Sequence, residues 1–591
     1  MGRTDSRGRT LFVLFVFVVT SVAIVARLAW WQVVRSEDLA AEARRQATVR
    51  TEQPSPRGTI YDRSGLVVLA TTIERDRLVV AADKLTNPAR RTLLEGLSRI
   101  LELGDDARLA LDERLRSGRA YVVLARDLEP ETSKRIRDAI AAGELPRVTL
   151  EPEPIRTYPQ AGGGPESTLA AHLIGFVNRE GVGQYGVEQQ YQSLLSGSPR
   201  VLLAQRDVNA RSIPETAIVA DPGVRGADLR LTIDAGLQLA VEQELLHTWV
   251  ADRAISVSAV VIDPYSGEVY AHASYPSYDA NDYRAIAADA PNRFVDPIVS
   301  QVYEPGSVFK MFTALAALEQ GTVTTATRIR DEGTLPLDKG RTKIDNADRK
   351  SKGWMTFEDA IAWSRNVVAA KVALGLGDST RDASAALHEV WSRVGFGAPT
   401  GIDLANASFG QGVAVTPIQL ATSYAAMVNG GTLLRPHVVK GIGEEEVASA
   451  VGPPVIDPEV SETLIGMMNH VVSEVPFYRD RTLIPGYFVG GKTGTAQIWD
   501  TKIKNWKTNL FNYSFVGYVG REEGTPELVV AVRINEAQPT VAKVGQLEMP
   551  VMSFELFRRI ATTAITTQGL LPDVPRRPHP HGTPGPVAAD R

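Results

Sequence analysis

The sequence predicts an α+β fold with three parts: a single N-terminal transmembrane helix, an elongated pedestal domain, and a larger domain with a five-stranded antiparallel sheet flanked by helices. Three observations lead to this prediction. An apolar run lies near the N-terminus, short strands alternate with charged helices after it, and two early and three late strand patterns enclose a mostly helical stretch. The expected parts are a cytoplasmic tail at 1–9, a membrane anchor at 10–34, the pedestal at 35–223, the larger domain at 224–570 and a disordered tail at 571–591.

The apolar run follows three arginines and covers the 22 residues 10–31, enough to cross a bilayer. Arg27, Trp30 and Trp31 lie near its end, where such side chains reach the membrane interface. A cleaved signal peptide is the alternative, but the run ends in Arg-Leu-Ala-Trp-Trp, a poor cleavage site. The preceding arginines predict a cytoplasmic N-terminus, so we expect a single-pass protein of the plasma (inner) membrane whose larger domain is extracytoplasmic.

Composition argues against several classes of function. The net charge of −5 over 591 residues argues against nucleic acid as the main partner. The absence of cysteine excludes disulfides and thiolate catalysis, and the eight histidines are scattered. We therefore expect neither a metal nor a cofactor.

The region after the anchor carries no recognisable chemistry. Residues 36–50 predict a helix that is N-capped by Ser36, extends the membrane helix as a stalk and is stopped by Pro54. Residues 66–220 contain no nucleophile–base pair, phosphate loop or metal-ligand spacing. We expect this region to be a spacer or docking domain.

The larger domain shows two groups of strand patterns. A turn at 264–267 predicts a hairpin between the first two strands, and the three later strands have short connections. A further strand at 229–234 and an amphipathic helix at 235–249 precede them. The expected strands of the sheet are 259–263, 268–273, 487–497, 513–520 and 528–535.

A first motif, Ser307-x-x-Lys310, places a hydroxyl and an amine one helical turn apart. Pro305 and Gly321 mark the start and end of the helix, so Ser307 lies in its first turn, where the helix dipole favours negative charge. Lys310 is a base only when neutral, and lowering its pKa by ~3 units costs roughly 4 kcal/mol. Burial and a second cation, for which Lys492 is the candidate, supply that shift.

A second motif, Ser364-Arg365-Asn366, follows Ser307 by 57 residues, at the end of a helix that Thr356 caps. Two residues apart in a turn, Ser364 and Asn366 can face one cleft. Ser364 can then relay a proton between the first-motif lysine and a leaving amine, and Asn366 can hold a substrate amide.

A third motif, Lys492-Thr493-Gly494-Thr495, lies 126 residues beyond Asn366 in a strand context. Gly494 allows another backbone to approach, so a peptide can align along the strand. Lys492, Thr493 and Thr495 can hold a terminal carboxylate, and the Thr495 N–H can join that of the first-motif serine in an oxyanion hole. Each motif alone is weak, but their order, spacing and context agree.

Together the motifs resemble the class B penicillin-binding proteins, membrane-anchored peptidoglycan transpeptidases. The likeness covers nearly the whole chain. The segments that carry it are 57–65, 156–159, 171–175 and 186–188 in the pedestal, and 303–310, 409–412, 416–420 and 492–497 in the larger domain.

The resemblance implies a serine D-Ala-D-Ala transpeptidase that cross-links stem peptides in septal or lateral wall synthesis without a cofactor. Ser307 is then the acylated nucleophile and Lys310 its base. It also implies covalent inhibition by β-lactams and partnership with a SEDS-type glycan polymerase and other membrane cell-wall or divisome proteins. Two alternatives stay open: a hydrolase of the D,D-carboxypeptidase or β-lactamase type, and a β-lactam-binding sensor.

Two departures from the family pattern stand out. Arg365 replaces the more usual small or acidic residue of the second motif. The family pattern therefore does not determine the charge at the mouth of the cleft. The loop between Leu404 and Phe409 is shorter than is usual, and this should open one side of the cleft and alter acceptor binding.

Overall fold

The computed structural model describes residues 6–39, 48–205, 213–400, 414–450, 452–500, 504–543 and 546–572. The chain forms two compact units, which are described one by one. The first unit comprises Met1–Arg57 and Ser196–Gly226, and the second comprises Gly58–Leu195 and Ala227–Arg591.

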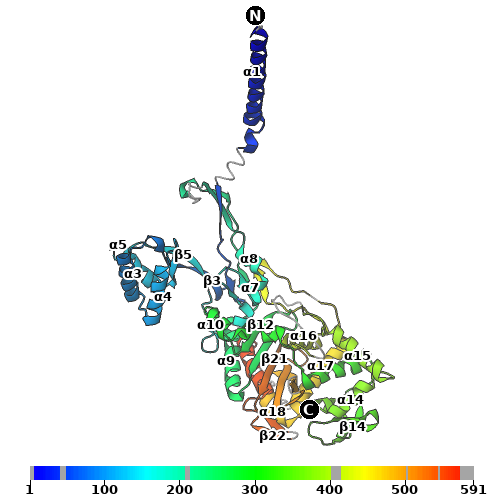
Figure 1. Cartoon of the computed structure of the whole chain (residues 1–591). Helices are drawn as coiled ribbons and strands as arrows, with labels where there is room; N and C mark the ends of the chain where they lie inside the picture. The colour runs from blue at the N-terminus through cyan, green and yellow to red at the C-terminus, as the bar shows by residue number, and fades with distance from the viewer. Residues whose placement is uncertain are drawn as a thin grey trace, which may run out of the picture. The chain divides into compact units, whose positions relative to one another are not determined.

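The first unit contains the apolar helix and a small sheet. Helix α1 (Ser6–Ala29; Figure 1) continues into a π-helical turn, η1 (Trp30–Val34). The apolar side chains of α1 are exposed. Among the described residues, this helix is the one long and apolar enough to cross a membrane. Strands β1 (Thr48–Gln53), β8 (Arg200–Gln205) and β9 (Ile218–Asp221) form an antiparallel sheet in the order β1-β8-β9.

The prediction of a stalk helix through residue 50 is wrong at its end. Residues 36–39 are helical, but the segment from Thr48 to Gln53 is strand β1, paired residue by residue with β8. The local sequence contains Thr48, Val49 and Thr51, β-branched residues that favour a strand when a partner is present. That partner lies about 150 residues further along the chain, where a local helix pattern cannot reveal it.

The second unit begins with a mixed sheet in the order β18-β17-β10-β2-β3-β4, with β5 paired to β3. Three helices pack on its far strands around an apolar cluster of their own. The strands are β2 (Ile60–Tyr61), β3 (Val68–Val80), β4 (Val122–Leu128), β5 (Val148–Thr157), β10 (Leu229–Leu231), β17 (Val439–Ile442) and β18 (Glu445–Glu446), and the helices are α3 (Asn87–Ile100), α4 (Asp105–Arg116) and α5 (Pro130–Ala141).

The family-like segments of the predicted pedestal contact one another in this unit. The Nε of Arg156, at the end of β5, lies 2.7 Å from the Glu188 carboxylate in helix α7 (Gly186–Gln190). A second guanidinium nitrogen of Arg156 donates to the Gly58 carbonyl at 2.8 Å. Both charged side chains are buried, at 4% and 0% exposed, so this pair joins three distant segments inside the unit.

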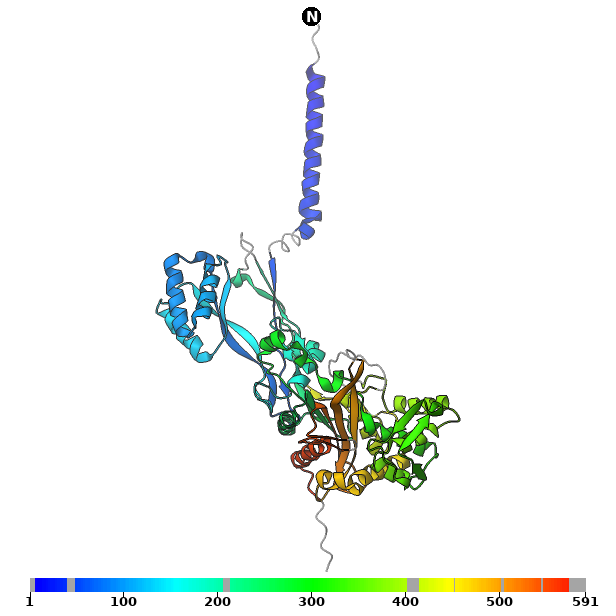
Figure 2. The ribbon, with the colours of Figure 1, turned by 60° about the horizontal axis from the view of Figure 1, so that its bottom comes forward.

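The expected five-stranded antiparallel sheet is confirmed, in the order β12-β11-β21-β20-β19. Strand β19 lies at its edge. In Figure 2 the red-brown C-terminal helix lies on one side of the orange strands and the green helices lie on the other. The strands are β11 (Ser256–Ile262), β12 (Val269–Tyr275), β19 (Phe488–Asp500), β20 (Asn505–Gly520) and β21 (Leu528–Ala537).

Helices cover both faces of this sheet, which explains its apolar strands. Val257, Ala259 and Val261 of β11 belong to the core shared with α9 (Ala235–Asp252) and α19 (Ser553–Thr567). Alternate residues of the same strand, such as Val260, belong to the core on the opposite face, with helix α16 (Pro417–Val428). A strand buried on both faces reads as an unbroken apolar run.

The stretch between the early and late strands is mostly helical, as expected, and it also contains two small two-stranded antiparallel sheets. These pairs are β13 with β16 and β14 with β15. The helices and strands of this stretch include α10 (Tyr283–Asp289), α11 (Pro297–Ser300), α12 (Lys310–Glu319), β13 (Arg328–Asp331), β14 (Thr334–Leu337), β15 (Thr342–Asp345), β16 (Gly353–Thr356), α13 (Phe357–Ala362), α14 (Asn366–Leu374), α15 (Thr380–Arg393), α16 (Pro417–Val428), α17 (Pro458–Glu474) and α18 (Pro476–Thr482).

Candidate active site

Ser307 and Lys310 lie at the start of one helix, where the sequence places them. A 3-10 turn, η5 (Gly306–Phe309), leads directly into α12 (Lys310–Glu319). The Lys310 amine lies 3.0 Å from the Ser307 hydroxyl oxygen. Gly306 has a φ of +66°, a left-handed conformation that glycine adopts without steric cost.

Ser364 lies between α13 and α14, in the turn that the second motif predicts. The Thr356 hydroxyl accepts from the Asp359 N–H and caps α13, and Asn366 begins α14. Ser364 itself has a φ of 55°, an uncommon conformation for a residue with a side chain. This turn brings the second motif against Lys310.

The hydrogen bonds around Lys310 suit a neutral amine that faces a nucleophile. Its nitrogen lies 2.7 Å from the Ser364 carbonyl oxygen and 2.6 Å from the Asn366 side-chain oxygen, both of which only accept. The hydroxyls of Ser307 and Ser364 are each 3.0 Å away. A neutral amine has two N–H donors for the two acceptors, so its lone pair is left for a hydroxyl.

Lys492 reaches the same place from β19. Its side chain is fully buried, and its nitrogen lies 3.1 Å from the Ser364 hydroxyl and 3.3 Å from the Thr493 carbonyl. The Ser364 oxygen therefore lies between two amines, at 3.0 Å from Lys310 and 3.1 Å from Lys492. A hydroxyl in this position can pass a proton between them.

The environment changes the pKa of both lysines. Burial lowers the pKa of Lys310 well below its usual value, and the positive charges of Lys492 and Arg365 lower it further. Burial alone lowers the pKa of Lys492 to about 7. The positive charge of Lys492 therefore favours the neutral form of Lys310, as a base beside a nucleophile requires.

Gly494 allows β19 to lie directly against the turn that precedes Ser307. A Cβ at this position would be 2.3 Å from the Pro305 carbonyl oxygen and 2.3 Å from the Ser514 hydroxyl. On the other side of the contact, a Cβ at Gly306 would be 2.8 Å from the Thr495 carbonyl. The two glycines thus bring the backbone of Thr495 beside the start of η5.

The structure brings Ser307, Lys310, Ser364, Asn366 and Lys492 into one connected set of hydrogen bonds. The three expected substrate-binding residues follow Lys492 along the edge strand, with Thr495 exposed.

Tyr478 is a site residue that sequence reasoning missed. Its hydroxyl lies 3.3 Å from the Thr493 hydroxyl, which is itself 3.4 Å from the Lys492 amine. Tyr478 lies in α18, outside any recognisable motif, so only the tertiary contact between α18 and β19 identifies it.

Comparison with known proteins gives the family. Residues 257–552 match the penicillin binding protein transpeptidase domain, and residues 52–231 match the penicillin-binding protein dimerisation domain. The chain belongs to the class B penicillin-binding proteins. This result confirms the resemblance that the three motifs predicted.

Relatives of this penicillin-binding protein align over most of their length. Stage V sporulation protein D of Bacillus subtilis is 29% identical over 579 residues, which cover 92% of this chain and 84% of the relative. Peptidoglycan D,D-transpeptidase FtsI of Escherichia coli K12 is 28% identical over 580 residues, which cover 93% of this chain and 90% of the relative.

Solved structures share the fold. Penicillin binding protein 2X from Streptococcus thermophilus aligns with a TM-score of 0.68 at 20% identity, covering 88% of this chain and 80% of that chain. Penicillin binding protein 3 from Mycobacterium tuberculosis, solved in complex with aztreonam, aligns with a TM-score of 0.62 at 21% identity. The alignment covers 88% of this chain and 98% of that chain.

The first departure from the family pattern, Arg365, is buried. Its residue is 5% exposed, and its guanidinium pairs with the carboxylates of Asp331 and Asp348. The second departure, the short loop between Leu404 and Phe409, lies outside the described residues.

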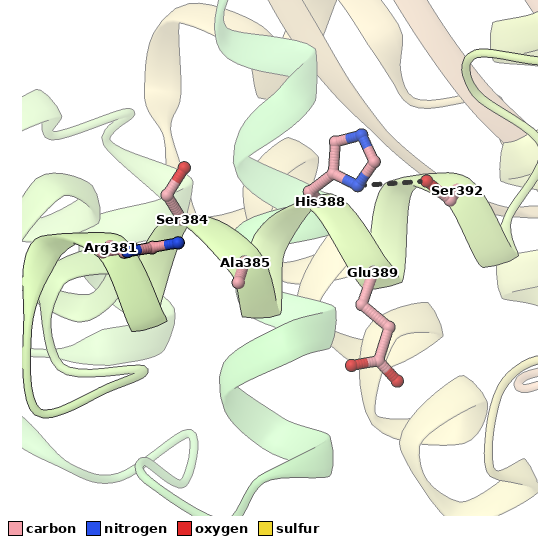
Figure 3. A pocket seen from close by; sticks show the side chains of 6 residues that line it. All are labelled: Arg381, Ser384, Ala385, His388, Glu389 and Ser392. Atoms are coloured by element: carbon pink, nitrogen blue, oxygen red, sulfur yellow. Dashed lines mark hydrogen bonds between the residues drawn. The ribbon is translucent and has the colours of Figure 1, made fainter.

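A hollow on the surface of α15 contains another serine and histidine, but it does not form a catalytic triad. The His388 Nδ1 lies 3.4 Å from the Ser392 hydroxyl, and Glu389 points away from the imidazole in Figure 3. All the lining residues lie on this one helix, and none belongs to the three motifs. A triad would need a carboxylate that orients the imidazole.

Proposed function

We propose that this penicillin-binding protein is a peptidoglycan D,D-transpeptidase in which Ser307 forms the acyl-enzyme with stem peptides ending in D-Ala-D-Ala. The observation that carries the proposal is the position of the Lys310 amine, 3.0 Å from Ser307 and held by acceptors of the second motif. The transpeptidase-domain match and relatives named peptidoglycan D,D-transpeptidase support the same reaction.

In the first half-reaction, Lys310 takes the proton of the Ser307 hydroxyl while the oxygen attacks the carbonyl carbon of the penultimate D-Ala. The resulting oxyanion accepts hydrogen bonds from the N–H groups of Ser307 and Thr495. The C–N bond then breaks, and the proton passes from Lys310 through the Ser364 hydroxyl to the nitrogen of the leaving D-Ala. This route fits the short distances from Ser364 to Lys310 and Lys492.

In the second half-reaction, the amine of a neighbouring stem peptide attacks the ester carbonyl. Lys310 accepts a proton from this amine and returns one to the Ser307 oxygen as the ester C–O bond breaks. The product is a new amide cross-link, and the serine is regenerated. In the part of the chain that the structure describes, the hydrogen bonds of Ser307, Lys310 and Ser364 involve no carboxylate that would activate water for hydrolysis.

The donor peptide lies along the free edge of β19, where an extended chain can add to the sheet. Lys492, Thr493 and Thr495 hold its terminal carboxylate, and Gly494 keeps the strand close to the nucleophile. The same carboxylate chemistry accounts for recognition of β-lactams, which acylate Ser307 covalently. A relative of the same fold is described in complex with the β-lactam aztreonam.

The setting of this reaction is part of the proposal. The N-terminal helix anchors the protein in the plasma (inner) membrane, with residues 1–9 in the cytoplasm and the parts at 35–223 and 224–570 outside it. The helix and pedestal bind a SEDS-type glycan polymerase, which supplies uncross-linked glycan to this site. The protein serves septal or lateral wall synthesis.

The test is an exchange reaction with the detergent-solubilised full-length protein. A stem pentapeptide ending in D-Ala-D-Ala is incubated with a fluorescent D-amino acid, and the released D-Ala and the exchanged product are quantified. A transpeptidase gives exchanged product that the Ser307→Ala variant does not form. Hydrolysed tetrapeptide without exchanged product would assign the protein to the hydrolases, and acylation by penicillin without turnover would make it a sensor.

A further inference from the structure

Arg365 is held by two carboxylates, those of Asp331 at the end of β13 and Asp348 in the segment between β15 and β16. Its Nε donates to Asp331 at 2.8 Å, and its two Nη atoms donate to the two Asp348 oxygens at 2.9 and 3.1 Å. One Nη also donates to the Lys350 carbonyl. The Asp331 side chain is fully buried, whereas Asp348, which accepts the bidentate pair of hydrogen bonds from the guanidinium fork, is 30% exposed.

The same segment also holds the residues that follow Arg365. The Asn366 amide donates to the Asp345 carbonyl at 2.9 Å, and the Val367 N–H donates to the Asn346 side-chain oxygen at 3.1 Å. The Asn346 amide in turn donates to Asp331 at 2.6 Å. Three consecutive residues after Ser364 are therefore fixed on one support.

This support matters because Ser364 has a left-handed backbone conformation and its hydroxyl must stay within hydrogen-bond distance of two amines. A φ of 55° is unusual for serine and persists only where the surroundings impose it. The hydroxyl lies 3.0 Å from the Lys310 amine and 3.1 Å from the Lys492 amine. A small rotation of the turn would break one of these two contacts.

We propose that Arg365 is a positioning residue of the transpeptidation reaction, which fixes the Ser364 hydroxyl between the amines of Lys310 and Lys492 by bridging Asp331 and Asp348. The inference rests on the proposed function, since it assigns a role to Ser364 in proton transfer. The inference also explains why an arginine occupies the centre of the second motif, because a lysine or a small side chain could not form this fork.

The fork also has an electrostatic effect on the base. The charged groups that face Lys310 are Lys492 and Arg365, and those that face Arg365 are Asp331 and Asp348. The charge of Arg365 lowers the pKa of Lys310. Loss of that charge leaves two carboxylates uncompensated and favours the protonated lysine, whereas loss of the Asp348 charge acts in the opposite direction.

The test measures the second-order rate of acylation by fluorescent penicillin from pH 5 to pH 9 in full-length protein. We expect Arg365→Gln to slow acylation at least about 10-fold at neutral pH and to move the acid limb of the profile to higher pH. Arg365→Lys keeps the charge but cannot span both carboxylates, so its rate falls while its acid limb stays in place. Asp348→Asn should move the acid limb to lower pH.

The matched control is Arg559→Gln, which should leave the profile unchanged. This substitution breaks an exposed ion pair with Glu244, and both residues are far from Arg365 in the sequence. Thermal unfolding and the final amplitude of labelling report whether each variant is folded. A folded Arg365→Gln protein with the wild-type rate and profile overturns the inference. So does a loss of amplitude with unchanged rate and profile, which would make Arg365 only structural, while failure of the wild type to acylate overturns the proposed function as well.

Discussion

The close contact between β19 and the turn before Ser307 makes Gly494→Ala an informative substitution. The added Cβ would lie 2.3 Å from the Pro305 carbonyl oxygen, whereas ordinary contacts begin at 3.4 Å, so strand and turn must separate by about 1 Å. The Ser514 hydroxyl can rotate away, but the Pro305 carbonyl belongs to the backbone. The shift therefore falls on the two segments that carry the N–H groups of Ser307 and Thr495, which we propose as the oxyanion hole.

We expect Gly494→Ala to reduce both the stability of the fold and the rate of acylation. Crowding of this kind costs about 1–3 kcal/mol of stability. A displacement of about 1 Å at a reacting centre can lower the rate by about 10²-fold. We expect Gly494→Ala to lower the thermal midpoint modestly. We also expect it to reduce the rate of acylation by fluorescent penicillin by about 10²-fold.

The control is Gly466→Ala, in the middle of α17. A Cβ there meets nothing within 4 Å, and alanine is favoured over glycine in a helix by about 1 kcal/mol, so stability should rise slightly and acylation should not change. If folded Gly494→Ala protein acylates at the wild-type rate, the reasoning about the close approach of β19 is refuted.

Three further predictions concern buried charges and pH. Glu188→Gln leaves the Arg156 guanidinium buried without its carboxylate and should cost about 3–5 kcal/mol in the free energy of unfolding; an unchanged thermal midpoint would contradict this. Burial raises the pKa of Asp252 to about 7, against about 4 in an unfolded chain, so the folded form binds the extra proton and stability falls as pH rises from about 4 to about 7. Asp252→Asn should flatten this slope in thermal melts recorded across that range, and an identical slope in both proteins would exclude Asp252 as its source. Burial lowers the pKa of Lys492 to about 7, so kcat/KM for a donor with a free terminal carboxylate should decline above about pH 7, while the methyl ester of the same donor should lack this decline. Parallel pH profiles for the two donors would show that the charge of Lys492 does not bind the carboxylate.

The sheet could be predicted because its strands carry their own signal. Strand β11 is apolar on both faces, and its hairpin with β12 has a recognisable turn. The apolar pattern of the sequence predicts that β20 starts at residue 513, but the strand begins at Asn505. Its polar first half is defined by pairing with β19 and not by an apolar pattern. The strand after the membrane helix was missed for the same reason, since β1 depends on distant β8.

The candidate site could be predicted where residue type and spacing define a local geometry. Ser307 and Lys310 are three residues apart on a helix, so their contact follows from the sequence. The contacts of Ser364 with Lys492, and of Tyr478 with Thr493, join segments that only the folded chain brings together. For the same reason the sequence left open whether Arg365 is exposed or, as the structure places it, buried.

The central claim is that Ser307 is the nucleophile of this site, and peptide mapping tests it most directly. Full-length protein is treated with benzylpenicillin, its intact mass is measured, and the adduct is located by proteolysis and mass spectrometry. The account predicts a single long-lived adduct on the peptide that contains Ser307 and no adduct on the Ser307→Ala variant. An adduct on a different residue, or an adduct that persists in the variant, would contradict it.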